Sequence, residues 1–453
     1  MGNPHVLVIR FPGQGHVLPL MELSQWLAKH GIKITVANTE YNLHKLLVNA
    51  LAKEEDDHQI ANSVRLVTTG FGNQPETKIA EMLSMPAEKI KELINQINAS
   101  SDGDKVTCVL IDTHLTWDME IVRQMGIRRA TFCAPQAAQY VLISSIPKLI
   151  EDGIIGHDGI PTKKQKFQFS PTMPAMNTSR LFWLKSGIKK NVEKYLFKHA
   201  LDIHKSMVLT EWVLCNSTYD LEPAAFNMHP KILPIGPLLA TNQSGNSAGN
   251  LFTEDLSCLK WLDQQAIQSV IYVAFGTFAT FDQTQFQEFA TGLELSNRPF
   301  LWVVCSDIMN KLNDAFIDGF QARVGARGLI ISWAPQQKVL KHPSIACFFI
   351  HCGWNSTIEA LSNGVPLLCW PFMFDQFYNE NYICNVWEVG LGFDLDEGAI
   401  VTREEIENKV RELLGSEKYK ANALHLKKKI TSSKKEGGCS YKNFMTFVAW
   451  LKA

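Results

Sequence analysis

Short apolar runs alternate with longer amphipathic segments through the first half of the chain. Residues 6–9 form the first apolar run, and residues 18–30 follow with leucines spaced along one helical face until Gly31 ends the pattern. Such a pair predicts a buried strand and an amphipathic helix. Further strands are predicted at residues 32–37, 64–68, 106–111, 130–133 and 213–216. Strands that alternate with helices are typical of a parallel, doubly wound sheet.

A polar segment interrupts this alternation near the middle of the chain. Residues 241–252 are rich in Gly, Ser and Asn, which indicates a linker, and further strands are predicted at 270–275, 300–304, 329–332, 345–350 and 367–370. We therefore predict an α/β protein of two facing, Rossmann-like, doubly wound domains with a cleft between them. The predicted boundaries are 1–240 for the N-terminal domain, 253–435 for the C-terminal domain and 436–453 for a helix that packs back on the first domain.

Composition excludes several classes of protein. Of the 453 residues, 46% are hydrophobic and 20% are charged, which is typical of a globular chain and not of a disordered one. The 44 Lys and Arg residues balance the 45 Asp and Glu residues, so net charge favours neither nucleic acid nor a membrane surface. No apolar run is long enough to cross a bilayer, and no secretory signal is recognised. We expect a cytoplasmic monomer that binds neither nucleic acid nor membrane.

A glycine turn in the second domain has the features of an anion site. His351 ends a predicted apolar strand, Gly353 permits a tight turn, and Asn355 or Ser356 is placed to cap the next helix. Such a turn binds anions, because N–H groups and the positive end of the helix dipole converge there. An alternative needs no ligand, since Ser356 and Glu359 have the spacing of a capping box.

The same segment, residues 333–376, carries groups that suit a base and a sugar. Trp333 follows a predicted strand and is held extended by the Ala-Pro after it, so its ring offers a flat face to a base; a core tryptophan is the alternative. Asp375 and Gln376 follow the next strand. A carboxylate beside an amide suits the hydroxyl groups of a sugar.

Two side chains in the first domain have the chemistry of a general base and its orienting acid. His16 stands in Gly-Gln-Gly-His just before the predicted helix, where the positive dipole end favours the neutral ring that can accept a proton. Asp112 ends a strand at the same sheet edge and would hold that ring through one N–H, as in a catalytic triad. The alternatives are a loop histidine satisfied by its neighbours and a helix cap by Asp112. His114 is interpreted as a bystander.

Residues 333–376 resemble the signature box of the plant UDP-dependent glycosyltransferases, the family 1 enzymes of small-molecule metabolism, and the resemblance extends over nearly the whole chain. It implies the GT-B fold, with the donor held by the C-terminal domain, and an inverting displacement that needs no cofactor and no metal. The family's base and acid stand in the contexts of His16 and Asp112. Gln376, the last residue of the box, implies glucose rather than galactose, so UDP-glucose is the expected co-substrate.

The resemblance also implies a role for each matching residue. Trp333 would stack on uracil, with Ala334 and Gln336 beside it, and Glu359 would bind the ribose. The expected donor-binding residues are Gly15, Gly276, Thr277, Trp333, Ala334, Gln336, His351, Gly353, Trp354, Asn355, Ser356, Glu359, Asp375 and Gln376. Among these, His351, Asn355 and Ser356 would hold the diphosphate, and Trp354, Asp375 and Gln376 would contact the sugar. One departure is Ala134, which stands where many members have a Thr or Ser that reaches the sugar.

No motif specifies the acceptor. Apolar and aromatic segments of the first domain indicate a small lipophilic acceptor with a free hydroxyl, such as a flavonoid, phenolic or terpenoid. The expected acceptor-binding residues are Phe71, Gln136, Tyr140, Phe182, Trp183 and Phe374. The alternatives are the same fold with another UDP-sugar, or a non-catalytic protein that binds nucleotide sugars. An NAD-dependent oxidoreductase is disfavoured, because Leu18 occupies the third glycine position of G-x-G-x-x-G.

Overall fold

The chain forms two compact units. The computed structural model describes residues 3–11, 13–38, 64–68, 87–100, 104–116, 119–184, 190–239, 254–276, 281–304, 314–396 and 400–453. Unit 1 comprises Met1–Gln165, Trp183–Leu251 and Ser432–Ala453, and unit 2 comprises Lys166–Phe182 and Phe252–Thr431. The division near the C-terminus falls within one continuous helix, α19 (Glu417–Lys434).

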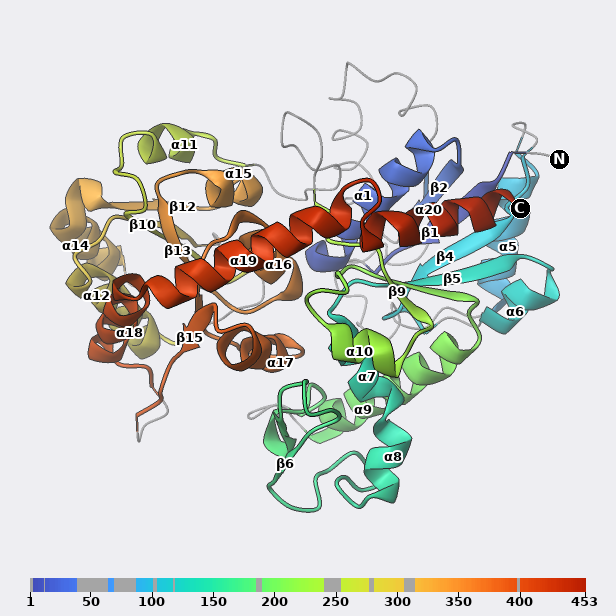
Figure 1. Ribbon diagram of the computed structural model, residues 1–453, viewed down its shortest axis with the longest axis horizontal. Coiled ribbons are helices and arrows are strands. Elements are labelled where there is room, and N and C mark those ends of the chain that lie inside the picture. Colours follow the sequence, from blue (N-terminus) through green and yellow to red (C-terminus); the bar gives the residue numbers. More distant parts are fainter. Residues whose placement is uncertain are drawn as a thin grey trace. The chain divides into compact units, whose positions relative to one another are not determined.

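Unit 1 is built on a parallel sheet of seven strands (Figure 1). The strands are β1 (His5–Ile9), β2 (Lys33–Asn38), β3 (Val64–Thr68), β4 (Cys108–Asp112), β5 (Arg128–Cys133), β8 (Trp212–Cys215) and β9 (Ile232–Pro234). Their order is β3-β2-β1-β4-β5-β8-β9, and every neighbouring pair is parallel. This order confirms the predicted doubly wound sheet. The sequence analysis did not predict β9, which is three residues long and ends in proline.

Helices cover both faces of this sheet, because alternate strand residues are apolar on both sides. On β1, Val6 and Val8 belong to a buried cluster with α1 and α20, whereas Leu7 and Ile9 belong to a second cluster with α5. The C-terminal helix α20 packs on the first unit through Phe444, whose ring contacts Trp26 edge-on at 5.6 Å. The described helices of unit 1 are α1 (Gln14–Lys29), α5 (Ala87–Asn98), α6 (Met119–Gln124), α7 (Ala137–Ser144), α8 (Ile146–Glu151), α9 (Lys190–Val208), α10 (Pro223–Met228) and α20 (Cys439–Lys452).

Unit 2 contains a second parallel sheet, of six strands, in the order β12-β11-β10-β13-β14-β15 (Figure 1). The strands are β10 (Val270–Ala274), β11 (Phe300–Val303), β12 (Gly328–Ile331), β13 (Ile345–Ile350), β14 (Leu367–Cys369) and β15 (Gly390–Gly392). Its helices are α11 (Ser257–Leu262), α12 (Gln283–Leu295), α14 (Asp314–Val324), α15 (Gln336–Lys341), α16 (Trp354–Asn363), α17 (Gln376–Asn381), α18 (Arg403–Gly415) and most of α19, with a 3-10 turn at Gly325–Arg327 and a π-helical turn at Tyr382–Val386. Both sheets confirm the predicted fold class.

A hairpin from the first half of the chain belongs to unit 2, which differs from the predicted boundary at residue 240. Its strands are β6 (Lys166–Phe167) and β7 (Met176–Asn177), followed by a 3-10 turn at Thr178–Arg180. Arg180 pairs with Glu380 at 2.9 Å, and its guanidinium lies 5.3 Å from the ring centroid of Phe377. The amide of Asn381 donates to the carbonyl of Ala175 at 2.9 Å. These polar and cation–π contacts do not change the spacing of hydrophobic residues, so the hydrophobic pattern of the sequence could not predict them.

Among the described helices, none combines the length and the apolar character needed to cross a membrane.

Candidate active site

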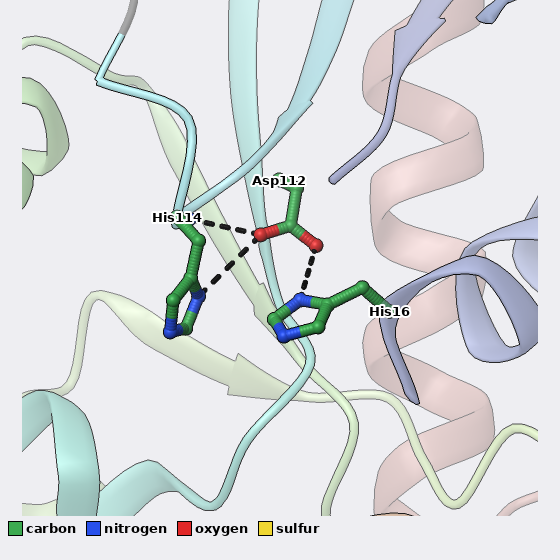
Figure 2. A group of neighbouring side chains, drawn as sticks. All are labelled: His16, Asp112 and His114. Carbon is green, nitrogen blue, oxygen red and sulfur yellow. Dashed lines mark hydrogen bonds and ion pairs between the residues drawn. The ribbon is translucent and has the colours of Figure 1, made fainter. Parts of the chain in front are cut away.

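The candidate site of unit 1 is a hydrogen-bonded pair of side chains (Figure 2). Nδ1 of His16 lies 2.8 Å from Oδ2 of Asp112, and the other ring nitrogen, Nε2, points away from the carboxylate. Asp112 is completely buried at the end of β4, whereas the side chain of His16 is 18% exposed. The two residues come from the carboxyl end of a strand and from a helix amino terminus, as the sequence analysis expected.

The position of His16 differs in one respect from the prediction. α1 begins at Gln14 and not at residue 18, so His16 lies inside the first helical turn. Gly13 is the N-cap, and its carbonyl accepts hydrogen bonds from the N–H groups of His16 and Val17 at 2.9 and 3.0 Å. The helix therefore fixes the His16 side chain more firmly than a loop would.

Asp112 is held in its ionised form. Its Oδ1 accepts a hydrogen bond from the backbone N–H of His114 at 2.8 Å, and its Oδ2 faces His16. Burial raises the pKa of this carboxyl, but the charge and hydrogen bonds of His16 and His114 outweigh burial and leave the pKa well below its usual range. The carboxylate thus orients a histidine ring, and the helix-cap alternative does not describe it, because the next helix begins only at Met119.

His114, interpreted from the sequence as a bystander, is part of the same cluster. Its Nδ1 lies 3.5 Å from Oδ1 of Asp112, and its ring meets the ring of His16 edge-on at 4.6 Å. Phe11 also packs against His16, and the centroids of the two rings lie 4.8 Å apart. In the described part of the chain, His16, Asp112 and His114 are the one group whose ligand atoms lie close enough together for a metal ion. The hydrogen bonds within this group suit a proton relay at least as well as they suit a metal site.

A second candidate site is the turn between β13 and α16 in unit 2. His351 follows β13, Gly353 is the N-cap, and α16 begins at Trp354 without a side-chain cap. The predicted caps are therefore wrong: Asn355 and Ser356 occupy the first helical turn instead. An extended glycine at the N-cap already directs the chain into the helix, so no side-chain cap is required. The capping-box alternative fails for the same reason, and the helix amino terminus keeps the character of an anion site.

Two glycines make room for the ring of His351. A Cβ at Gly353 would lie 2.3 Å from Nε2 of His351, and a Cβ at Gly276 would lie 3.0 Å from the same atom. Gly276 also has a φ of +71°, which disfavours any other residue. Burial lowers the pKa of His351 to about 4, against a smaller opposing effect of the Ala274 backbone. At neutral pH this side chain therefore offers a hydrogen bond to a phosphate and not a positive charge.

A network of amides surrounds the carboxylate expected to bind ribose. Nε2 of Gln336 donates to Oε2 of Glu359 at 2.6 Å and to the hydroxyl of Ser356 at 3.0 Å, while Nε2 of Gln337 donates to Oε1 of Glu359 at 3.1 Å. The hydroxyl of Tyr272 donates to Oε1 of Gln336 at 3.2 Å. Glu359 is 6% exposed, and each of its oxygens keeps a second lone pair for a sugar hydroxyl. Gln337 and Tyr272 were not identified from the sequence.

The two box tryptophans have different surroundings. Trp333 is half-buried beside the buried Ala334, which leaves part of its ring accessible to a base. Trp354 is 4% exposed, and its indole packs on Trp387 with ring centroids 6.3 Å apart. A contact between Trp354 and a sugar would therefore come from its backbone N–H at the start of α16.

The sugar end of the box is organised around α17. Asp375 is the N-cap residue, and Oε1 of Gln376 accepts hydrogen bonds from the backbone N–H groups of Phe372 and Met373 at 2.7 and 3.0 Å. The amide of Gln376 can then only donate to a sugar oxygen. Asn379, a residue not identified from the sequence, is completely buried and donates to Oδ2 of Asp375 and to the carbonyl of Cys352.

The described acceptor candidates are divided between the two units. Trp183 is completely buried, and its indole N–H donates to the carbonyl of Gly159 at 2.9 Å. Phe182 lies with the hairpin of unit 2. Phe374 is 47% exposed with a φ of +55°, just before Asp375. Gln136 is the N-cap residue of α7, and Tyr140 lies within α7. Phe71 and Thr277 lie outside the described residues.

Comparisons with known proteins identify the family of the chain. A family model described as "UDP-glucoronosyl and UDP-glucosyl transferase" matches residues 204–432. UDP-glycosyltransferase 83A1 of Arabidopsis thaliana is 40% identical over 467 residues, which cover 100% of this chain and 98% of that protein. The chain therefore belongs to the plant family 1 UDP-dependent glycosyltransferases, which act on small molecules, and it has their GT-B fold.

Solved structures give the same result. Os79 of O. sativa, in complex with UDP, superposes with a TM-score of 0.78 at 28% identity, over 98% of this chain and 100% of that one. UGT2 of Phytolacca americana, in complex with UDP-2-fluoro-glucose and pterostilbene, superposes with a TM-score of 0.81 at 25% identity, over 99% of each chain. The protein is thus a glycosyltransferase by family and by fold.

Proposed function

We propose that this glycosyltransferase moves glucose from UDP-glucose to a hydroxyl group of a small-molecule acceptor, with inversion at the anomeric carbon. The observation that carries the proposal is the pair formed by His16 and the buried, ionised Asp112. A hydroxyl group attacks an anomeric carbon only if a base removes its proton, and a histidine held through Nδ1 presents Nε2 for that purpose.

The proposed reaction is a single displacement. Nε2 of His16 accepts the proton of the acceptor hydroxyl while the hydroxyl oxygen bonds to the anomeric carbon. The bond between that carbon and the β-phosphate oxygen breaks, and UDP leaves with the electron pair. Asp112 stabilises the imidazolium that forms, because its carboxylate is already hydrogen-bonded to Nδ1. One displacement inverts the configuration of the sugar.

The unit 2 residues are proposed to hold the donor. The first turn of α16 would bind the diphosphate through backbone N–H groups, with a hydrogen bond from His351. Glu359 would accept hydrogen bonds from ribose, and Trp333 would stack on uracil. For the sugar, Asp375 supplies an acceptor and the amide of Gln376 a donor, and this pair supports the choice of UDP-glucose over other UDP-sugars. The bound UDP-2-fluoro-glucose of the Phytolacca structure supports the same choice.

The test is a transfer assay with UDP-glucose, UDP-galactose and UDP-glucuronate on a panel of hydroxyl acceptors, read by the mass of the product and by released UDP. With UDP-glucose we expect an acceptor product that is heavier by one hexose, and a kcat/KM higher than with UDP-galactose or UDP-glucuronate. A protein that binds UDP-glucose but transfers it to no acceptor would support the alternative of a non-catalytic binding protein. A tenfold preference for a rival sugar would overturn the choice of donor.

A further inference from the structure

Arg10 is a buried cation with no counter-ion in the described part of the chain. It follows β1 directly, its side chain is 1% exposed, and none of its three guanidinium nitrogens has a hydrogen-bond partner among the described residues. Burial lowers the pKa of this guanidinium to about 10, so the group remains charged at neutral pH. An unpaired buried charge is strongly unfavourable, and native proteins almost always supply a partner. Arg10 is therefore placed to pair with an anion that is not part of the described chain.

The position of Arg10 connects this charge to the reaction. The register pairs Ile9 of β1 with Ile111 of β4, so Arg10 and Asp112 take the next positions along neighbouring strands. The following residue, Phe11, packs on the ring of His16. Asp112 is not the counter-ion, because its oxygens face His16 and His114. Within the described ranges, the positive charge of Arg10 is thus uncompensated.

Other buried polar groups without partners occur at the same edge of the sheet. Gln136, after β5, is completely buried, and neither its amide oxygen nor its amide nitrogen has a partner in the described part of the chain. The same is true of the hydroxyl of Thr218, after β8. Because β1, β5 and β8 belong to one parallel sheet, these groups follow its carboxyl ends, where ligands bind in such folds. A purely apolar ligand would leave all of them unsatisfied.

We propose that the acceptor of this enzyme carries a carboxylate that pairs with Arg10, together with polar groups that bond to Gln136, while its hydroxyl reaches His16. The inference rests on the proposed function and narrows its acceptor from a lipophilic molecule to an anionic one. A guanidinium binds carboxylates through two parallel hydrogen bonds, which fixes the orientation as well as the charge of the ligand. The diphosphate of the donor is the other anion in the reaction, and the residues expected to bind it belong to unit 2. The effect of Arg10→Met on UDP affinity distinguishes the two anions.

The test compares acceptors that differ only in charge. 4-Hydroxybenzoate and 4-hydroxycinnamate are assayed beside their methyl esters, which keep the phenol and lose the carboxylate, with the wild type, Arg10→Met and Arg10→Lys. We expect the wild type to prefer the better carboxylate over its ester by about tenfold or more in kcat/KM, since a hydrogen-bonded charge pair has at least that effect. Arg10→Met should abolish the preference, and Arg10→Lys should keep part of it. A wild type that shows no preference, or an Arg10→Met variant that keeps it, would overturn the proposal.

Thermal unfolding gives a readout that needs no turnover. If the anion that pairs with Arg10 comes from a ligand, Arg10→Met should unfold at a higher temperature than the ligand-free wild type, because the substitution removes an unpaired buried charge. The carboxylate probe should then raise the unfolding temperature of the wild type and not that of Arg10→Met. A lower unfolding temperature for Arg10→Met would show a counter-ion within the chain, and a loss of UDP affinity would assign Arg10 to the donor; either result overturns the proposal. If the wild type bound UDP but glycosylated no acceptor at all, the proposed function would fail, and the thermal shift would still decide the role of Arg10.

Discussion

Asn379 donates a hydrogen bond to Oδ2 of Asp375 at 2.9 Å from a completely buried position. The same amide nitrogen donates to the carbonyl of Cys352 at 2.8 Å. One side chain therefore connects the carboxylate expected to bind the sugar with the turn expected to bind the diphosphate. Asn379 is a positioning residue in this arrangement, since it reaches the donor only through other groups.

We predict that Asn379→Ala weakens UDP-glucose binding more than UDP binding, because only UDP-glucose uses Asp375. The loss of one buried hydrogen bond, worth about 1 kcal/mol, would change the ratio of the two Kd values roughly fivefold. Calorimetric titration with each ligand measures the ratio. Asn381→Ala is the matched control, because its amide lies in the same helix but donates to Ala175 in the hairpin. Equal losses for UDP and UDP-glucose would show that Asn379 acts through the Cys352 turn or the fold and not through Asp375.

The catalytic pair should separate chemistry from donor binding. His16→Ala removes the base and is expected to lower kcat by roughly 10²–10⁴-fold, with little change in the Kd of UDP, because the residues expected to bind the uracil, the ribose and the diphosphate belong to unit 2. Asp112→Asn should also lower kcat, since an amide cannot stabilise an imidazolium as a carboxylate does. Adding Asp112→Asn to His16→Ala should cost little more, because the two residues act as a unit. Near-normal turnover of His16→Ala on a hydroxyl acceptor would refute the assignment.

Gly353 offers a steric test of the diphosphate site. In Gly353→Ala the new Cβ would lie 2.3 Å from Nε2 of His351, and the backbone at φ −62° tolerates alanine, so the ring has to move. Such overpacking costs about 1–3 kcal/mol, and we expect UDP affinity to fall roughly five- to 150-fold. Gly415→Ala is the control, because nothing lies within 4 Å of its added Cβ. In a His351→Ala background the effect of Gly353→Ala should nearly vanish; an undiminished effect would exclude the steric explanation.

Chelation tests the expectation that no metal is required. Helix N–H groups and the neutral His351 are proposed to hold the diphosphate, so activity should survive EDTA. The one candidate group for a metal ion in the described chain is His16, Asp112 and His114, and its members already contact one another. Loss of activity on chelation, with recovery after addition of Mn²⁺ or Mg²⁺, would show that the expectation is wrong and would direct attention to this group.

The parts predicted from the sequence are those whose physical signal is local. Strands of parallel sheets are apolar on both faces, so runs such as Ile345–Ile350 were recognised at their exact bounds. His16 and Asp112 were expected at one sheet edge because each follows a recognisable element. The start of α16 was misplaced, because a glycine replaces the polar cap that marks most helices.

Other features depend on contacts between distant segments. Arg180 joins its hairpin to Glu380, 200 residues later, and no periodicity records such a pair. Two features of the site do have a signal in the sequence. Asp375 and Asn379 are four residues apart at the start of a helix, a spacing that puts two side chains on one face. Arg10 is a single charged residue directly after an apolar strand, where a ligand-binding edge is expected.

Stability should depend on pH through His199. This side chain on α9 is 8% exposed, and burial, together with the nearby His114, lowers its pKa to about 4 against the opposing effects of Asp202 and of a hydrogen bond with the His114 backbone. The unfolded chain binds a proton here below about pH 6.5, whereas the folded chain does so only below about pH 4. Between these values the unfolded state holds more protons, so the stability present above pH 6.5 is lost as the pH falls.

Between pH 7 and pH 5 the free energy of unfolding should therefore fall less for His199→Phe than for the wild type. The expected difference between the two losses is about 2 kcal/mol. Glu222 acts in the opposite direction, because burial raises the pKa of its carboxyl to about 6, so the wild-type slope alone does not isolate His199. The difference in pH dependence between the wild type and His199→Phe isolates His199, because Glu222 is present in both proteins. The measurement is denaturant unfolding of each protein at pH 7 and pH 5, followed by a signal from unit 1. Identical pH dependence in the two proteins would show that His199 is already protonated in the folded state at pH 5.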